Sequence, residues 1–316
     1  MNVQKTGPVS RVRKEQTMQR SKRISLLALV LLGALLLVAA GCGGGGKKKA
    51  KVATNSAMDK TIAAEVPSAV KSKGTLTVAS DASYAPNEFI GTDGHTVVGM
   101  SPDLATALGK VMGLKVKDVN AGFDTIIPGL SSGKYDLGVS SFTDTKKREK
   151  TVDFVTYFSA GTAFYVKAKG GPTINTLADL CGHKVTVEVG TTQKDDATTQ
   201  DGKCKAAGKK GVTVLAFPDQ NAANLALSSG RAEVGMADSP VASYIVKKSN
   251  GQFKLSGQVY ATAPYGIAIP KGNGMAKPIL AALKKLMSDG TYMKILQKWG
   301  IQEGAISNPA INGATS

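Results

Sequence analysis

The sequence predicts an α/β fold made of two similar lobes, each of which presents strand ends to a shared cleft. From Gly74 onward, strand-like segments alternate with helix-like segments, a pattern typical of largely parallel sheets. One unit also occurs twice: "LSSGKYDLGVSS" (130–141) returns 97 residues later as "LSSGRAEVGMAD" (227–238). In each copy a helix ends near a glycine, and a short strand follows that stops at small or polar residues. A chance recurrence of this common helix–turn–strand unit is the alternative.

The first half of the fold can be assigned element by element. Its first strand stops at Ser80-Asp81, and its first helix has Ser101 as the expected N-cap, Pro102 as the first helical residue and Gly113 as the stop. The expected elements here are, in order, a strand at 76–79, a helix at 101–113, a helix at 123–133 and a strand at 134–141.

The second half follows the same alternation. "HKVTVEVGTTQ" (183–193) is a strand that ends at Gly190, and the repeated unit supplies a second strand up to Asp238. The segment 276–301 then predicts an amphipathic helix pair with apolar Ile279, Leu280, Leu283, Leu286 and Met287. Residues 306–316 are small and polar, so we expect a loose tail.

The net charge of +17 is concentrated ahead of this fold. Residues 1–41 hold seven Lys and Arg against Glu15 alone, whereas from Gly74 onward 26 Lys and Arg stand against 20 Asp and Glu. A nucleic-acid-binding domain needs basic residues clustered on the fold and interleaved with aromatic ones. We therefore expect no nucleic-acid partner.

The N-terminal region has the features of an export signal. A basic flank at 20–23 precedes the continuous apolar run "ISLLALVLLGALLLVAA" (24–40), and Gly41-Cys42 follows at once. "VAAGC" is similar to the bacterial lipobox, with Ala39 where leucine is usual. We expect residues 1–41 to be a lipoprotein signal peptide and Cys42 to carry the lipid, so that the protein is anchored to the outer face of the cell membrane.

Other readings of this region stay open. A permanent anchor helix is the alternative to a cleaved signal, and either Met1 or Met18 can be the start. Residues 42–73 are rich in Gly, Lys, Ala and Thr and poor in large apolar residues, which predicts a flexible linker. Its "KKKAK" suits an anionic membrane surface.

Two cysteines, Cys181 and Cys204, remain after Cys42. In an exported protein, two such cysteines are expected to pair as a disulfide. Two cysteines without nearby histidines make a poor zinc site, so we expect no bound metal.

Polar residues gather at the expected strand ends. Ser140-Ser141 with Thr143, and Gly190-Thr191-Thr192 in the second half, offer hydroxyls and free backbone N–H groups that suit an anion. Arg148 can add a bidentate pair to a carboxylate, and Asp238 can bind an ammonium group. Together these groups describe a receptor for a zwitterion such as an α-amino acid. The alternatives are simple helix caps at both junctions and a solvated surface charge at Arg148.

The chain resembles the amino-acid-binding proteins of bacterial ABC importers, the polar amino acid group known as solute-binding family 3. The resemblance covers about residues 74–303 and is carried by "SDASYAPNEF", "SPDLATALG", "FDTIIPGLSSGKYDLGVSSFTDTKKREKTVDF", "VEVGTTQ", "RAEVGMADS" and "KWGI". It implies a two-lobed, periplasmic-binding-protein-like fold of type II, with one lobe from 74–160 and 265–305, the other from 161–264, and a hinge between them. It also implies a monomer that closes on a free amino acid and delivers it to an ABC permease with its ATPase.

The resemblance implies roles for single residues. Arg148 matches the arginine that binds the ligand's α-carboxylate, and Asp238 matches the carboxylate that binds its α-amino group. Asp81 matches an acidic residue near the side-chain end of the ligand in binders of lysine, arginine and ornithine. The other implied ligand-binding residues are Thr143 and Thr192 beside the carboxylate, Ser141 beside the amino group, and Tyr84 and Phe123 as aromatic walls.

Two positions leave the identity of the ligand open. Asn87 departs from the common "PFEF" pattern, and Glu188 stands where such proteins vary with their substrate. If Asp81 and Glu188 both face the pocket, a cationic side chain is favoured, with glutamine next, because a buried unpaired carboxylate is costly. The alternatives are that Glu188 points into solvent and that Tyr84 and Phe123 are ordinary core or rim aromatics.

The rival function is an enzyme on the same fold, such as a lyase similar to cyclohexadienyl dehydratase. The two histidines, His95 and His183, fit neither a nucleophile nor a metal spacing. The strand ends also hold no obvious spare acid–base pair, unless Glu188 supplies one. We therefore expect a binding protein without catalytic residues or cofactors.

Overall fold

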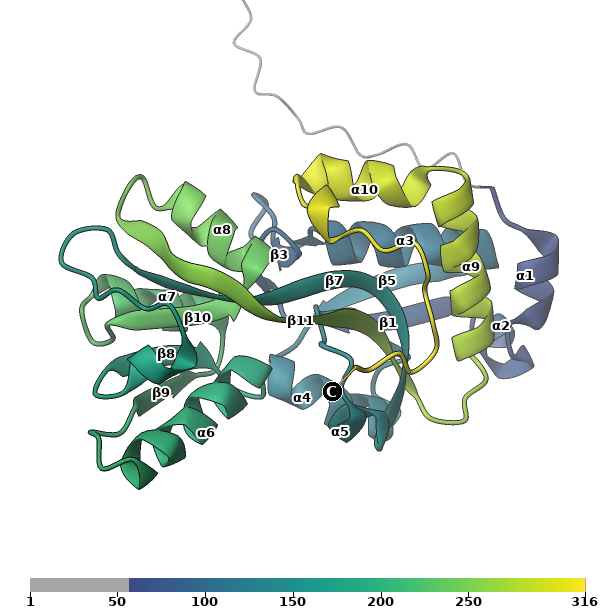
Figure 1. Ribbon diagram of the computed structural model, residues 1–316. Coiled ribbons are helices and arrows are strands. Elements are labelled where there is room, and N and C mark those ends of the chain that lie inside the picture. The colour runs from purple at the N-terminus through teal and green to yellow at the C-terminus, as the bar shows by residue number, and fades with distance from the viewer. Residues whose placement is uncertain (1–56, 316) are drawn as a thin grey trace, which may run out of the picture. The chain divides into compact units, whose positions relative to one another are not determined.

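The computed structural model describes residues 57–315 (Figure 1). The expected signal peptide (1–41), Cys42 and the first part of the expected linker lie outside the described residues. Within 57–315, no helix has the length and apolar character needed to cross a membrane.

Eight strands form one mixed sheet, in which two parallel parts flank a pair of long antiparallel strands. β1 pairs in parallel with β5 and β6, and β8 pairs in parallel with β9 and β10. In order across the sheet, the strands are β5 (Lys115–Asn120), β1 (Thr75–Ser80), β6 (Leu137–Gly138), β11 (Phe253–Pro270), β7 (Val152–Lys167), β10 (Val234–Asp238), β8 (Lys184–Glu188) and β9 (Thr213–Phe217). A small second sheet contains β2 (Ser83–Tyr84), β3 (Glu88–Ile90) and β4 (Val97–Val98).

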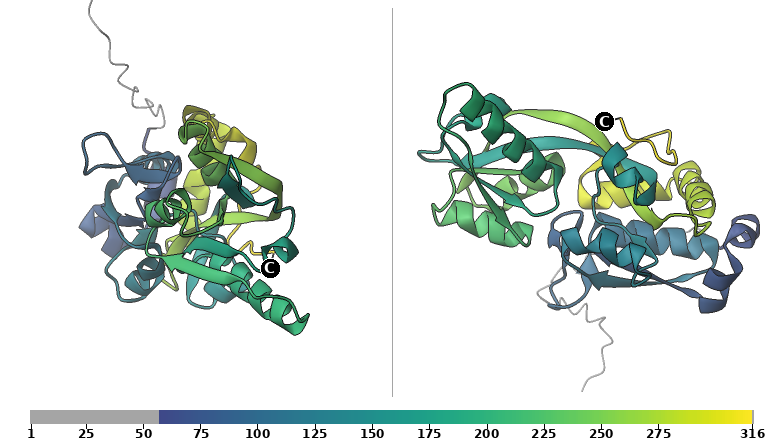
Figure 2. Two further views of the ribbon diagram at one scale, coloured as in Figure 1. Left: turned by 90° about the vertical axis from the view of Figure 1, so that its left-hand side faces the viewer. Right: turned by 90° about the horizontal axis from the view of Figure 1, so that it is seen from below.

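The two long strands join the two lobes. β7 has 16 residues and β11 has 18, and they pair antiparallel over most of their length, with register shifts between Ser256 and Gly266 (Figures 1 and 2). The chain enters the second lobe along β7 and returns along β11. The expected lobe boundaries, after residue 160 and after residue 264, fall inside these two strands.

Each lobe packs its helices around its own core. The first lobe has α3 (Met100–Met112), α4 (Phe123–Ser131), α5 (Lys146–Glu149), α9 (Ala276–Ser288), α10 (Thr291–Trp299) and the short η2 (Gln302–Gly304). The second has η1 (Leu177–Leu180), α6 (Thr192–Ala206), α7 (Gln220–Ser228) and α8 (Ser239–Lys248). Leu76, Leu104, Leu108, Ile279 and Leu283 are central to the first core, and Phe164, Leu180, Val185, Val187 and Val234 to the second.

The repeated unit takes matching places in the two lobes. In the first copy α4 leads into β6, which lies between parallel β1 and antiparallel β11. In the second copy α7 leads into β10, which lies between parallel β8 and antiparallel β7. The two copies therefore bring their polar strand ends to corresponding positions.

The start of α3 differs from the expectation. Gly99, at φ 140°, is the N-cap, and Ser101 is already helical. The Ser101 hydroxyl is not available for capping because it donates a 2.6 Å hydrogen bond to Glu88. The expected stop is confirmed: Gly113 ends the helix at φ 73°, a left-handed conformation that suits glycine.

The last part of the expected flexible linker is helical instead. α1 (Lys60–Glu65) begins at Asp59, whose carboxylate accepts hydrogen bonds from two backbone N–H groups of the first turn, and α2 (Ser68–Lys73) follows. Ile62 and Val66 are buried in the core of the first lobe. These two side chains hold the segment on the fold, so the linker expectation is wrong for this part.

The C-terminal segment is also not a loose tail. Ile311 forms an isolated bridge with Val155 on β7. Asn312 binds the backbone of Phe154 in both directions, at 2.8 and 2.9 Å, and its side-chain amide donates to Asp153 at 3.1 Å. Small polar residues suggested a loose segment, but their backbone groups pair with β7.

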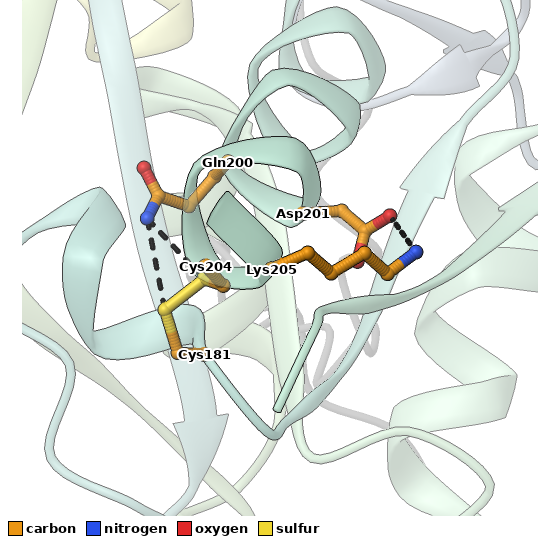
Figure 3. Close-up of a disulfide and its surroundings, with 5 residues drawn as sticks. All are labelled: Cys181, Gln200, Asp201, Cys204 and Lys205. Atoms are coloured by element: carbon orange, nitrogen blue, oxygen red, sulfur yellow. Dashed lines mark hydrogen bonds and ion pairs between the residues drawn. A yellow bond between two sulfur atoms is a disulfide. The ribbon is translucent and has the colours of Figure 1, made fainter. Parts of the chain in front are cut away.

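The expected disulfide is confirmed. Cys181 follows η1 and Cys204 lies in the last turn of α6, with their Cα atoms 5.6 Å apart (Figure 3). Gln200, one turn before Cys204, directs its amide nitrogen at the two sulfur atoms, at 3.4 and 3.7 Å. The bond ties α6 to the segment that precedes β8.

Candidate ligand-binding site

Strand ends from both lobes meet at one cavity. The first lobe contributes the residues that follow β1 and β6, and the second contributes the end of β8, the first turn of α6 and the end of β10. The cavity is lined by Asp81, Tyr84, Glu88, Phe123, Ser140, Ser141, Thr143, Arg148, Glu188, Thr191, Thr192, Gln193 and Asp238. Ligands of open α/β sheets bind at such strand ends.

Arg148 lies in the single turn of α5, whose N-cap is Thr145. Its guanidinium donates to the Thr143 carbonyl at 2.8 Å and, across the cleft, to the Gly190 carbonyl at 2.9 Å. It also lies over the ring of Phe123, with 5.4 Å between its central carbon and the ring centroid. Burial lowers the pKa of Arg148 to about 10, so the group is a cation at neutral pH.

Asp238 provides the opposite charge at the end of β10. It is buried, and the amide of Gln193 donates to its carboxylate at 2.8 Å. Its backbone N–H donates to the Tyr84 hydroxyl at 2.9 Å. Burial raises the pKa of Asp238, while the hydrogen bond from Gln193 and the charge of Arg148 favour the ionised form.

Three further carboxyl groups line the cavity. Asp81, Glu88 and Glu188 are 4, 0 and 2% exposed, and burial raises the pKa of each. One oxygen of Glu88 accepts from Ser101, and its other oxygen has no hydrogen-bond partner among the described residues. The cavity is therefore rich in carboxyl groups that face a single guanidinium.

Ser141 has an uncommon backbone conformation, at φ 50°. Its hydroxyl accepts a 2.9 Å hydrogen bond from the amide of Asn87, the residue that departs from the usual pattern. A non-glycine residue in the left-handed region carries some strain, and such residues cluster at binding sites. Here the turn directs the chain from β6 into the cavity wall.

The two lobes touch directly around the cavity. Besides the Arg148 contact, the Gln220 N–H donates to Ser83 at 3.0 Å and the Asp238 N–H donates to Tyr84. The cavity is about 10 Å³, roughly the space of one water molecule. An amino acid is far larger, so its entry requires the side chains or the lobes to move apart.

The structure brings all nine residues expected at the site to this one cavity. Glu188 is buried and does not point into solvent, and Tyr84 and Phe123 line the cavity as well as packing in the core. Two lining residues, Glu88 and Gln193, were not expected at the site. Ser140 and Thr191 belong to the polar strand ends already noted in the sequence, and Thr191 is also the N-cap of α6.

The described residues contain no group of three or more His, Cys, Asp or Glu side chains arranged to hold a metal ion. The cavity offers a half-buried cation, buried carboxyl groups, hydroxyls and two aromatic faces.

Known families and characterised proteins include relatives of this chain. Residues 76–302 match the family described as bacterial extracellular solute-binding proteins, family 3. The arginine-binding protein ArgT of Corynebacterium glutamicum is 33% identical over 252 residues, which cover 79% of this chain and 82% of ArgT.

Solved structures agree in fold. An ancestral arginine-binding protein bound to arginine is 40% identical, with a TM-score of 0.66 over 72% of this chain and 98% of that one. The same kind of protein bound to glutamine is 39% identical, with a TM-score of 0.66 and the same coverage. The fold is thus the two-lobed α/β fold of periplasmic binding proteins.

Proposed function

The chain belongs to the bacterial extracellular solute-binding proteins of family 3, and from that premise we propose that it is the amino-acid-binding subunit of an ABC importer. It captures a polar L-amino acid outside the cytoplasm and delivers it to a membrane permease whose ATPase powers transport. Its relatives are binding proteins, and we propose that this chain likewise performs no chemistry on its ligand.

One observation carries the proposal: the half-buried guanidinium of Arg148 and the buried carboxylate of Asp238 face the same cavity. Arg148 suits an α-carboxylate, and the hydroxyls of Thr143 and Thr192 lie beside it. Asp238 suits an α-ammonium group, with Ser141 nearby. A zwitterion satisfies both charges, and a buried charge without a partner is costly.

Capture follows from the division of these groups between lobes. Arg148, Ser141 and Thr143 belong to the first lobe, and Thr192 and Asp238 to the second. A ligand that touches both sets favours the closed arrangement over an open one by its differential contacts. β7 and β11 act as the hinge, and Tyr84 and Phe123 enclose the ligand's side chain.

The side chain of the ligand meets Asp81 and Glu188, which favours arginine, lysine or ornithine, with glutamine next. Attachment to the membrane through lipid on Cys42, and action as a monomer, complete the proposal. A dehydratase-like enzyme is less well supported, because Asp81, Glu188 and Asp238 all have binding roles in this arrangement.

A thermal-shift screen of the purified protein against the standard amino acids, ornithine and citrulline tests this proposal. A ligand that binds the folded state raises the melting temperature by mass action. We expect the largest shifts with arginine, lysine or ornithine, and none in Arg148→Ala or Asp238→Ala. No shift with any of these compounds, after co-purified ligand has been removed, would overturn the proposal.

A further inference from the structure

The carboxylate of Asp238 is held by a side chain that was not expected at the site. The Gln193 amide nitrogen donates to Asp238 Oδ1 at 2.8 Å and to the Thr162 hydroxyl oxygen at 2.9 Å. Gln193, Thr162 and Asp238 are 3, 4 and 7% exposed. An ionised carboxylate only accepts hydrogen bonds, so the amide must direct its nitrogen, and not its oxygen, toward Asp238. Both N–H groups of the amide are then in use.

These three side chains belong to the same lobe. Asp238 on β10 and Thr162 on β7 are direct partners where the two strands pair antiparallel. Gln193 lies in the first turn of α6, which follows β8 in that lobe. Hydrogen bonds within one lobe do not depend on how far the two lobes stand apart. The carboxylate is therefore held in the same way before a ligand is captured and afterwards.

The position of Gln193 is set by α6, which is attached at both ends. At its start the N-cap Thr191 donates its hydroxyl to the Glu188 carbonyl at 2.7 Å. In its last turn Cys204 forms the disulfide with Cys181. Only four of the 15 residues of α6 are buried, and two of these are glutamines. The cap and the disulfide, more than apolar packing, therefore keep this helix and its first turn in place.

A hydrogen bond to one oxygen fixes the direction of the other. With Oδ1 held by the amide, the Asp238 carboxylate resists rotation about its Cβ–Cγ bond, and Oδ2 keeps a constant orientation. An ammonium group that enters the cavity then meets an acceptor that is already ordered. Binding to a preorganised group avoids the entropic cost of ordering it, so the affinity is higher.

We propose that Gln193 is a positioning residue, which fixes the Asp238 carboxylate so that the site selects ligands with an α-ammonium group over analogues without one. The proposal rests on the amino-acid-binding function above. Gln193 acts through Asp238, so its contribution is present only when the ligand carries that group. A residue that merely filled space would affect the affinity for both kinds of ligand equally.

Isothermal titration calorimetry of the full chain with matched pairs of ligands tests the proposal. One pair is L-arginine and 5-guanidinopentanoate, which is arginine without its α-amino group. The other is L-glutamine and glutaramate, which differ in the same way. The measured quantity is the preference, the ratio of the two dissociation constants in a pair. We expect the unchanged protein to prefer the amino acid by about 100-fold, the effect of one strong charge-assisted hydrogen bond.

Gln193→Met is the decisive variant, because methionine has a similar length and volume but cannot donate a hydrogen bond. We expect the preference to fall about tenfold, since Asp238 loses one hydrogen bond and its fixed orientation. Gln200→Met is the matched control: the same change on the same helix, about two turns later, where the amide is directed at the disulfide. Its preference should equal that of the unchanged protein.

Thr162→Val tests the same role from the other side of the amide. Valine keeps the shape of threonine but cannot accept the hydrogen bond from Gln193. We expect a smaller decrease in the preference, about threefold, because the amide keeps its bond to Asp238 and loses the one that orients it. This variant also carries the test if Gln193→Met does not fold, which circular dichroism shows.

The outcomes separate this proposal from the one on which it rests. A preference that stays unchanged in the folded variants of Gln193 and Thr162 would overturn the positioning role and leave the amino-acid-binding function standing. An equal decrease in Gln200→Met would overturn it as well. Failure of the unchanged protein to bind either L-arginine or L-glutamine would contradict the binding function itself.

Discussion

The guanidinium of Arg148 links the two lobes as well as facing the cavity. Its two hydrogen bonds reach carbonyls on opposite sides of the cleft, at Thr143 and Gly190. It lies at the same time against two stacked rings, Phe123 and Phe142, whose centroids are 4.5 Å apart. A planar group with several donors can do this and still present an N–H edge to a carboxylate.

Lysine at this position should bind the ligand much less well. Arg148→Lys keeps the charge but has neither the fork geometry nor the flat face, so we expect the amino-acid affinity to fall about 10- to 100-fold, the effect of losing a charge-assisted hydrogen bond. Calorimetry measures the change. Arg231→Lys, at an exposed arginine of the second lobe, is the control and should bind normally. Equal affinities in the two variants would contradict the role given to Arg148.

Single residues were predictable where their chemistry was specific. Arg148 and Asp238 stand out as charged groups near the expected strand ends, and the resemblance to the solute-binding family implied their roles. Gln193 was missed because its direction depends on how the first turn of α6 is oriented, which a sequence does not specify. Glu88 was missed because one glutamate between Asn87 and Phe89 gives no sign of which side it faces.

At the level of elements, the C-terminal segment acts as a short added strand beside β7. Asn312 is its main attachment, with φ 53° and side-chain hydrogen bonds at both ends of its amide. Asn312→Ala removes those bonds from a half-buried position, and we expect the free energy of unfolding to fall by about 1 to 2 kcal/mol. Urea denaturation checks this. Asn308→Ala, at an exposed asparagine of the same segment, should have little effect; a loss of the same size there would contradict the assignment.

The disulfide should contribute more than that segment. Closing the 23-residue separation between Cys181 and Cys204 stabilises a fold by about 3 kcal/mol in the chain-entropy model. We expect the double Cys181→Ala, Cys204→Ala variant to lose about this much stability. A reductant should lower the melting temperature of the unchanged protein to near that of the variant, and should not affect the variant. A reductant effect on both would contradict this explanation.

The alternation of strands and helices, and the repeated unit, were enough to predict the α/β lobes. Short or polar elements were not predictable in the same way. α1 and α2 have six residues each and little apolar surface, and they fold because Ile62 and Val66 find a core that distant parts of the chain provide. Ser101 was expected to be the N-cap of α3. Its hydroxyl instead donates to Glu88, which lies 13 residues earlier in the chain.

For the whole molecule, buried carboxyl groups predict that stability falls as pH rises. Burial raises the pKa of Asp118 to about 7 and of Asp144 to about 6, and those of the cavity carboxyl groups also rise. Between pH 4 and 7 the folded state therefore holds protons that the unfolded chain has released. Each protonated carboxyl group contributes stability at low pH, and this contribution is lost as pH increases, by at most about 1.4 kcal/mol per pH unit for each group.

Thermal unfolding of the ligand-free protein from pH 4 to pH 7 measures this dependence. We expect the melting temperature to decrease over that range and Asp144→Asn to flatten the decrease, because asparagine stays neutral. Asp195→Asn, at an exposed carboxylate, should leave the profile unchanged. A melting temperature that rises from pH 4 to pH 7 would show that the buried groups are ionised in the folded state.

The closed arrangement depends on a glycine at the contact between the lobes. A Cβ on Gly190 would lie 2.9 Å from the Cβ of Asp124 on α4, in the other lobe, and the residue has φ +76°. Gly190→Ala therefore pushes α4 away and should weaken amino-acid binding by at least about tenfold, in line with the 1–3 kcal/mol cost of overpacking. The decrease in radius of gyration on ligand addition, measured by small-angle X-ray scattering, should shrink as well.

Gly208→Ala separates this steric effect from backbone strain. Gly208 has nearly the same conformation, φ +70°, but nothing lies within 4 Å of the position a Cβ would take. Its alanine variant should lose about 1–2 kcal/mol of stability through the left-handed conformation and still bind and close normally. If both variants bound equally well, contact between Gly190 and Asp124 would not limit closure, and the ligand would have to be held with the lobes further apart than they are here. If only Gly190→Ala binds weakly, the affinity depends on how closely the two strand-end surfaces can approach.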